Sequence, residues 1–133
     1  MMWMPDTNAW IRYLNPQSSS VKGHFLKHSP NSIFLCDIVK AELYFGAFKS
    51  ARRDENLALL DELSLGFPSF PFDGSAARHF GRIRSELTQA GRPIGPYDLQ
   101  IAATALSHNF ILVTHNTREF SRVAGLQIED WGL

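Results

Sequence analysis

Short, uninterrupted apolar runs, separated by stretches of helical pattern, limit the folds open to this chain. The clearest runs lie at residues 1–5, 32–36 and 110–114. A strand that is buried on both faces has such a continuous run, whereas a strand with one face in water alternates apolar and polar residues. The runs therefore predict an α/β protein in which helices cover both faces of a mostly parallel sheet.

Helical patterns fill the stretches between the runs. One helix is expected to begin behind Asp37 as its N-cap, and Gly91 is expected to end the longest helix. The prolines within 67–72 favour a short edge strand there, and 126–128 is expected to form a last strand. Because no repeat or long linker interrupts the pattern, residues 1–133 are expected to form one domain. The other predicted elements are helices over 8–14, 54–65, 74–90 and 96–106 and a polar turn over 114–118.

The composition excludes several classes of protein. Hydrophobic residues make up 44% of the chain and charged residues 20%, which is typical of a folded domain with an ordinary core. Thirteen basic residues balance thirteen acidic ones, so an anionic partner must be bound by a local patch or through a metal ion. Cys36 is the single cysteine, which excludes an internal disulfide and a cysteine-rich zinc site. Because the sequence has neither a secretory signal pattern nor an apolar run of membrane-spanning length, the protein is expected in the cytoplasm.

Three acidic residues occupy positions where a merely soluble protein needs no charge. Asp6 directly follows the first apolar run. Glu42 falls on the same helical face as Val39 and Leu43, and Asp98 falls on the same face as Ile101. Carboxylates on buried faces are uncommon unless they are paired or bind a metal. Because parallel sheets bind ligands at the carboxyl ends of their strands, the three acids are candidates for one shared site.

Each of these acids could also have an ordinary structural role. Asp6 could cap the helix that follows it. Glu42 could lie at the edge of its apolar face and reach water. Asp98 stands in a first helical turn behind Pro96, where the helix dipole favours a negative charge by about 0.3–1 kcal/mol. For any single residue both roles stay open, and it is the three together that favour a site.

A fourth candidate lies behind the clearest apolar run. Asn116 and Glu119 have the spacing of a capping box, which is one role that they could have. The alternative places Asn116 or Glu119 at the same sheet edge as Asp6. A set of oxygen ligands without cysteine or paired histidine favours Mg²⁺ or Mn²⁺ over zinc. Such ions in acidic pockets most often serve phosphoryl chemistry.

Four segments in order resemble the motifs of PIN domains: residues 5–8, 39–46, 94–103 and 113–120. Their order and spacing are similar to those of the VapC toxins of bacterial type II toxin–antitoxin pairs. The likeness covers nearly the whole chain and includes residues 129–131 near its end.

The resemblance implies a PIN-like three-layer sandwich with a central, mostly parallel sheet flanked by helices. It also implies an endoribonuclease that depends on Mg²⁺ or Mn²⁺, cleaves structured RNA, often tRNA, and is inhibited by a cognate VapB-like antitoxin. Asp6, Glu42 and Asp98 match the catalytic acids of the family. Where the family usually has a further Asp, this chain offers Glu119 as the fourth catalytic acid and Asn116 as a neutral ligand. The expected metal ligands are therefore Asp6, Asp98, Glu119 and Asn116, and one or two metal ions remain open.

Basic and aromatic residues are the candidates for binding partners. Arg78, Arg82 and Arg92 are expected to contact RNA phosphates, although Arg78 and Arg82, four residues apart, could equally form a solvated helix face. The first two main helices carry more aromatic surface than one small sheet needs. Part of it is expected to bind an antitoxin segment or a second copy in a homodimer, with simple core packing as the alternative. These aromatic residues are Trp10, Tyr13, Tyr44, Phe45 and Phe48.

The sequence leaves further functions open. A housekeeping PIN-type nuclease would use the same acids, and a catalytically inactive RNA- or protein-binding module would keep the fold without the activity. A dehalogenase-type phosphatase would require a second Asp two residues after Asp6, where this chain has Asn8. A phospho-acceptor receiver domain would require a Lys after a late strand, and residues 110–119 contain none.

Overall fold

The computed structural model describes residues 1–15, 17 and 19–132. A parallel three-stranded sheet has the spatial order β1 (Trp3–Pro5), β4 (Ile111–Val113), β5 (Ile128–Glu129). A second parallel pair joins β2 (Leu35–Cys36) to β3 (Ser69–Phe70). The amide of Phe34 donates to the carbonyl of Trp3 at 2.9 Å and a bridge links Trp3 to Ile33, so the strands follow the order β3, β2, β1, β4, β5.

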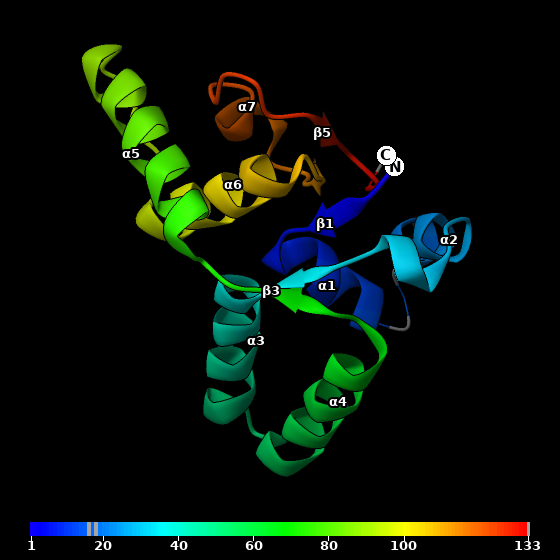
Figure 1. The fold of residues 1–133 in the computed structure, drawn as a ribbon. Coiled ribbons are helices and arrows are strands. Elements are labelled where there is room, and N and C mark those ends of the chain that lie inside the picture. The colour runs from blue at the N-terminus through cyan, green and yellow to red at the C-terminus, as the bar shows by residue number, and fades with distance from the viewer. Residues whose placement is uncertain (16, 18, 133) are drawn as a thin grey trace.

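Helices lie on both sides of these strands. In Figure 1, α5 and α6 lie on one side of the strands and α2, which packs against α1, on the other. The predicted class, a parallel sheet flanked by helices, is therefore confirmed. The helices are α1 (Thr7–Leu14), α2 (Ser19–Leu26), α3 (Asp37–Lys49), α4 (Arg53–Gly66), α5 (Gly74–Gln89), α6 (Pro96–His108) and α7 (Thr117–Phe120), with a 3₁₀ turn at Pro30–Ser32.

Several predicted boundaries need correction. Asp37 is the first residue of α3 and not its cap, because its carboxylate is held by the Ser69 hydroxyl of β3. The predicted polar turn at 114–118 contains the start of α7, and the last strand lies at Ile128–Glu129. Helix α2 was not predicted, because its serines, glycine and histidine have no clear helical pattern. Gly91 follows α5 with a φ of 67°, as expected for a helix-ending glycine.

The core lies between the sheet and α6. Met4 and Leu112 have no exposed surface, and neither do Ile101 and Ala102 of α6. Because the strands are only two or three residues long, their side chains alone form a small core, and the helices supply most of the buried apolar surface. None of the described helices is both long and apolar enough to cross a membrane.

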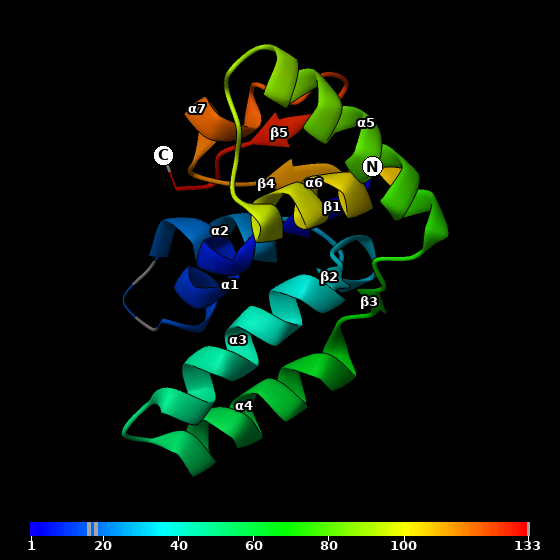
Figure 2. The same ribbon diagram turned by 90° about the vertical axis from the view of Figure 1, so that its left-hand side faces the viewer.

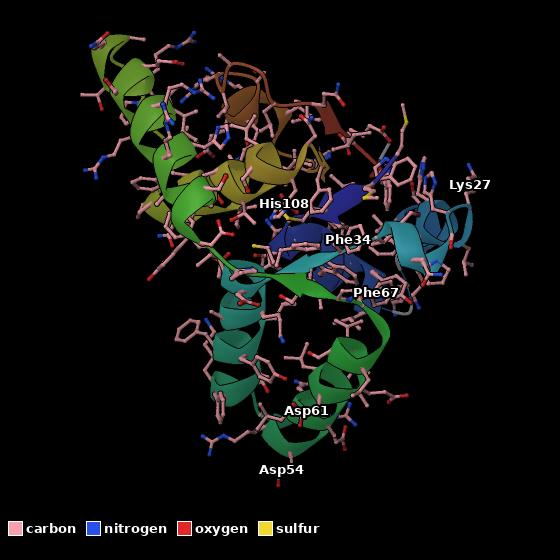
Figure 3. All side chains as sticks on the ribbon, viewed as in Figure 1. Lys27, Phe34, Asp54, Asp61, Phe67 and His108 are labelled. Atoms are coloured by element: carbon pink, nitrogen blue, oxygen red, sulfur yellow. The ribbon has the colours of Figure 1, made fainter. Side chains whose placement is uncertain are left out.

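Helices α3 and α4 form a hairpin that projects away from the sheet (Figure 2). Phe67, labelled in Figure 3 at the end of α4, packs edge-on against Trp10 of α1 with ring centres 4.9 Å apart. Between the two helices, the Tyr44 hydroxyl donates to Asp61 at 2.6 Å. The hairpin is therefore anchored to α1 at its base, and its outer part is left free to contact other molecules.

Candidate active site

Asp6 lies at the carboxyl end of β1, beside the end of β4. Pro5 pairs with Val113, and the Asp6 amide donates to the Val113 carbonyl at 2.8 Å. The Asp6 side chain caps α1 by accepting a hydrogen bond from the Ala9 amide at 2.9 Å. The helix-capping role, one of the two that the sequence left open for Asp6, is therefore confirmed. Asp6 is nevertheless only 7% exposed, and burial raises its pKa although hydrogen bonds from Thr114 and Ala9 oppose the rise.

Glu42 lies in the second turn of α3 and faces α1. It is half-buried, and one carboxylate oxygen accepts the Thr7 hydroxyl at 2.6 Å. Because Thr7 directly follows Asp6, this hydrogen bond holds Glu42 on the side of the sheet edge where Asp6 lies. The charge of Glu42 contributes to the raised pKa of Asp6.

Asp98 lies in the first turn of α6, which begins at Pro96. Its pKa is raised to about 6, first by burial, then by the charge of Glu119 and hydrogen bonding with it, and then by the charges of Glu42 and Asp6. The carboxylates from β1, α3, α6 and α7 therefore lie close enough to repel one another. A group of like charges held together is typical of functional sites, where a cation or substrate relieves the repulsion.

Glu119 and Asn116 do not form the capping box that their spacing allows. The Asn116 side-chain amide donates to one Glu119 oxygen at 2.5 Å, and the Gly95 amide donates to the other at 3.4 Å. Asn116 makes no side-chain cap to α7. The carboxylate of Glu119 is thereby turned toward the start of α6 and toward Asp98.

The side chains that could bind a metal ion here offer oxygen atoms as ligands, which suits a hard divalent cation such as Mg²⁺. Within residues 1–15, 17 and 19–132, no three acidic, imidazole or thiol side chains meet around one point that could hold a metal. Mg²⁺ does not require such a closed set, because it commonly binds one or two carboxylates and keeps several waters. Among the other acids, Glu119 raises the pKa of Asp98 the most, and Glu42 and Asp6 raise it less.

Three supporting groups were not identified from the sequence. Thr7 holds Glu42, the Gly95 amide holds Glu119, and Thr114 acts on Asp6. The Thr114 hydroxyl also accepts a hydrogen bond from the backbone N–H of Asn116 at 3.0 Å, and Thr114 is almost fully buried. Position in the sequence could have identified the two threonines, because Thr7 directly follows Asp6 and Thr114 directly follows β4. The role of Gly95 had no sequence signal, because any residue other than proline offers the same amide.

The predicted RNA-binding arginines lie on α5 and the loop behind it. Arg78, Arg82 and Arg92 are all exposed. Arg82 forms an ion pair with Glu86 at 3.0 Å, so part of the positive charge of this face is neutralised. Figure 2 shows α5 arching over α6, whose first turn carries Asp98.

An apolar groove of about 330 Å³ lies between α1, α3 and α4. Ile11, Leu43 and Leu59 line it, and Glu42 lines it too, so the groove borders one of the four acids. The aromatic residues divide between the two roles that the sequence left open. Trp10 is fully buried and belongs to the core, whereas Phe45 and Phe48 are 65% and 53% exposed on α3.

Comparisons with known proteins agree with this geometry. The PIN domain family matches residues 3–126 of the chain. The tRNA(fMet)-specific endonuclease VapC of Shigella flexneri is 39% identical over 131 residues, which cover 98% of each protein.

Solved structures give the same relationship. DNA-bound VapBC from Salmonella typhimurium has a TM-score of 0.91 at 36% identity over 98% of both chains. VapBC-5 of Mycobacterium tuberculosis, a member of the VapBC family of toxin-antitoxin systems, has a TM-score of 0.72 at 25% identity over 97% of this chain and 96% of that one. The resemblance carried by the four sequence motifs is thus confirmed over nearly the whole length. This chain belongs to the PIN-domain family, and within it to the VapC ribonucleases.

Proposed function

We propose that this protein is the toxin of a type II toxin–antitoxin pair, a divalent-metal-dependent endoribonuclease that cleaves structured RNA, specifically tRNA, in the cytoplasm. The proposal is supported by the position of four acidic side chains, held by Thr7, the Ala9 amide and the Gly95 amide, near the carboxyl ends of β1 and β4, where Asp98 interacts with Asp6, Glu42 and Glu119. The kinship with a tRNA-specific endonuclease supports the substrate class.

Asp6, Asp98 and Glu119, with Asn116, are the proposed metal ligands, and Mg²⁺ or Mn²⁺ is the proposed ion. When bound, the ion would neutralise charge on the phosphate and activate water for an in-line displacement. Thr114 and the Ala9 amide orient Asp6, while Asn116 and the Gly95 amide orient Glu119. Glu42, held by Thr7, is the proposed catalytic carboxylate that orients the attacking water.

A cognate VapB-like antitoxin is the proposed inhibitor, and the apolar groove between α1, α3 and α4 is its proposed docking site. The groove fits an apolar stretch of a partner, and that partner would lie next to Glu42, one of the four acids. Phe45 and Phe48 are exposed on the same helix and are proposed to contribute to this contact or to a homodimer contact.

The first test is metal-dependent cleavage of tRNA by the purified protein. We expect cleavage with Mg²⁺ or Mn²⁺, no cleavage in excess chelator, and recovery when Mg²⁺ is restored, read by mapping new RNA ends on a sequencing gel. Addition of the protein encoded by the adjacent small gene is expected to stop cleavage. Cleavage that persists in chelator would refute the metal dependence, and failure to cut any RNA would favour an inactive binding module.

The arginines of α5 are tested by charge reversal. Changing Arg78 and Arg82 to Glu is expected to weaken tRNA binding and to reduce the slope of log Kd against log salt by about 0.7–0.9 for each phosphate that the variant no longer binds. Glu86→Gln is the matched control, because it removes the carboxylate that holds Arg82 and is expected to leave tRNA binding equal or slightly tighter. An unchanged slope in the double variant would identify the pair as a solvated helix face.

A further inference from the structure

The loop between β4 and α7 borders a second group of polar side chains beside the acids. Thr114 and Asn116 interact with Asp6 and Glu119, whereas His115 between them pairs with Asp130. Nδ1 of His115 lies 2.9 Å from the Asp130 carboxylate, whose other oxygen accepts the Gly132 amide at 2.8 Å. Asp130 is therefore engaged through both of its oxygens.

Arg12 completes this cluster from the last turn of α1. A Cβ added to Gly132 would lie 2.5 Å from Nη1 of Arg12, 3.2 Å from Asp130 and 3.4 Å from Nδ1 of His115, so the three side chains converge on this glycine. The space between them is only about 10 Å³, enough for about one oxygen atom of a ligand. The arrangement is thus a shallow, closely packed surface site and not a deep pocket.

The guanidinium of Arg12 lies close to Gly132. In the described part of the chain, no carboxylate lies within ion-pair distance of it. It is close enough to Asp6 to act on the charge of that residue. A half-buried arginine without an acidic partner in the described residues, close to acids that must accept a phosphodiester, has N–H donors that can bind a phosphate oxygen.

We propose that Arg12 binds the phosphate of the RNA nucleotide next to the cleaved bond, and that Gly132 is a positioning residue whose missing side chain leaves room for the guanidinium. This inference rests on the proposed ribonuclease function. The RNA strand would cross the carboxyl edge of the sheet, with the cleaved phosphate at the acids and its neighbour at Arg12. Positive charge at this point offsets the repulsion between the acids and the RNA backbone.

Arg12→Gln and Gly132→Ala separate the charge from its position. Arg12→Gln removes the charge and is expected to raise KM and the Kd for tRNA about tenfold, with kcat changed less than twofold, because the arginine binds the substrate and the transition state equally. Gly132→Ala keeps the charge but forces Nη1 of Arg12 to move, and is expected to weaken binding in the same direction. Lys27→Gln is the charge-matched control at the outer end of α2 (Figure 3) and is expected to change neither constant.

Binding is measured in an Asp98→Asn background, where the tRNA stays intact, and kinetics in the wild-type background. The salt slope should fall by about 0.7–0.9 in Arg12→Gln. An unchanged slope and Kd in Arg12→Gln, with wild-type cleavage normal, would overturn the phosphate site and leave the proposed function standing. Failure of the wild-type protein itself to bind or cleave RNA would overturn both. A loss of kcat without a change of KM would also contradict the inference, because it would place Arg12 at the reacting atoms.

Discussion

Purified Asp98→Asn protein is expected to lose at least about 100-fold of its RNA cleavage rate while it keeps the native fold. Removal of groups that only support a metal ligand typically costs about 10–100-fold, so the loss of a ligand should cost more. Without metal, the variant should unfold at an equal or higher temperature than the wild type, because the substitution removes a half-buried charge that Glu119, Glu42 and Asp6 repel. Circular dichroism and a cleavage assay at saturating Mg²⁺ measure the two effects.

The pH dependence of stability gives an independent readout. The pKa of Asp98 rises from 3.8 to about 6 on folding, so the folded state binds this proton more tightly than the unfolded chain does. The resulting stabilisation is complete below pH 4 and is lost as the pH rises through 6. In metal-free protein, the difference in unfolding free energy between wild type and Asp98→Asn should therefore change between pH 4 and 7, by on the order of 1 kcal/mol after solvent screening. A constant difference, or near wild-type cleavage by the variant, would remove Asp98 from the site.

Glu119→Gln is expected to lower activity by at least about 100-fold, as for the loss of a metal ligand, with partial recovery at high Mn²⁺. The substitution keeps the shape of the side chain but removes the negative charge that Asn116 and the Gly95 amide hold toward Asp98. A weakened metal site is refilled by mass action, which is why added Mn²⁺ should restore part of the rate. Stability should change by no more than about 1 kcal/mol, the size of a helix-terminus effect.

Asn116→Ala is the companion variant, because the side-chain amide of Asn116 donates to Glu119. It should reduce activity less than Glu119→Gln if Asn116 only orients the glutamate. A larger loss in Asn116→Ala would make Asn116 the direct ligand. If both variants cleave tRNA at the wild-type rate, the catalytic group is limited to Asp6, Glu42 and Asp98.

The parallel sheet could be predicted from the sequence because its strands are continuous apolar runs, and few folds besides a covered parallel sheet produce this pattern. Helix α2 could not be predicted, because its serines, Gly23 and His24 give no regular apolar face. It is held instead by tertiary contacts: Phe25 is buried against Trp10 and Trp131, residues from both ends of the chain. Contacts between residues so far apart in the sequence cannot be predicted from its local periodicity.

The acids of the site could be named from their unusual positions, but the function of each could not. For Asp6 the sequence offered a helix cap or a site residue, and the structure shows a cap whose carboxylate is also buried beside Thr114. For Glu119 the expected capping box is absent, because Asn116 bonds to the side chain and not to the backbone. The structural and the functional role of such a residue differ in its hydrogen-bond partners. These partners lie far apart in the sequence or depend on side-chain rotamers, so residue spacing alone cannot predict them.

Strand order has a consequence for the moment at which this protein becomes active during its synthesis. β4 lies between β1 and β5, so the strand that carries Asp6 has no partner on that side until residues 111–113 have been made. At about 5–20 residues per second, the ribosome leaves the first strand without that neighbour for roughly 5–20 s. Nascent or prematurely terminated chains that lack β4 also lack Thr114 and Glu119, and so they cannot assemble the acids. The acids of the site can therefore come together only after nearly the whole chain has been made.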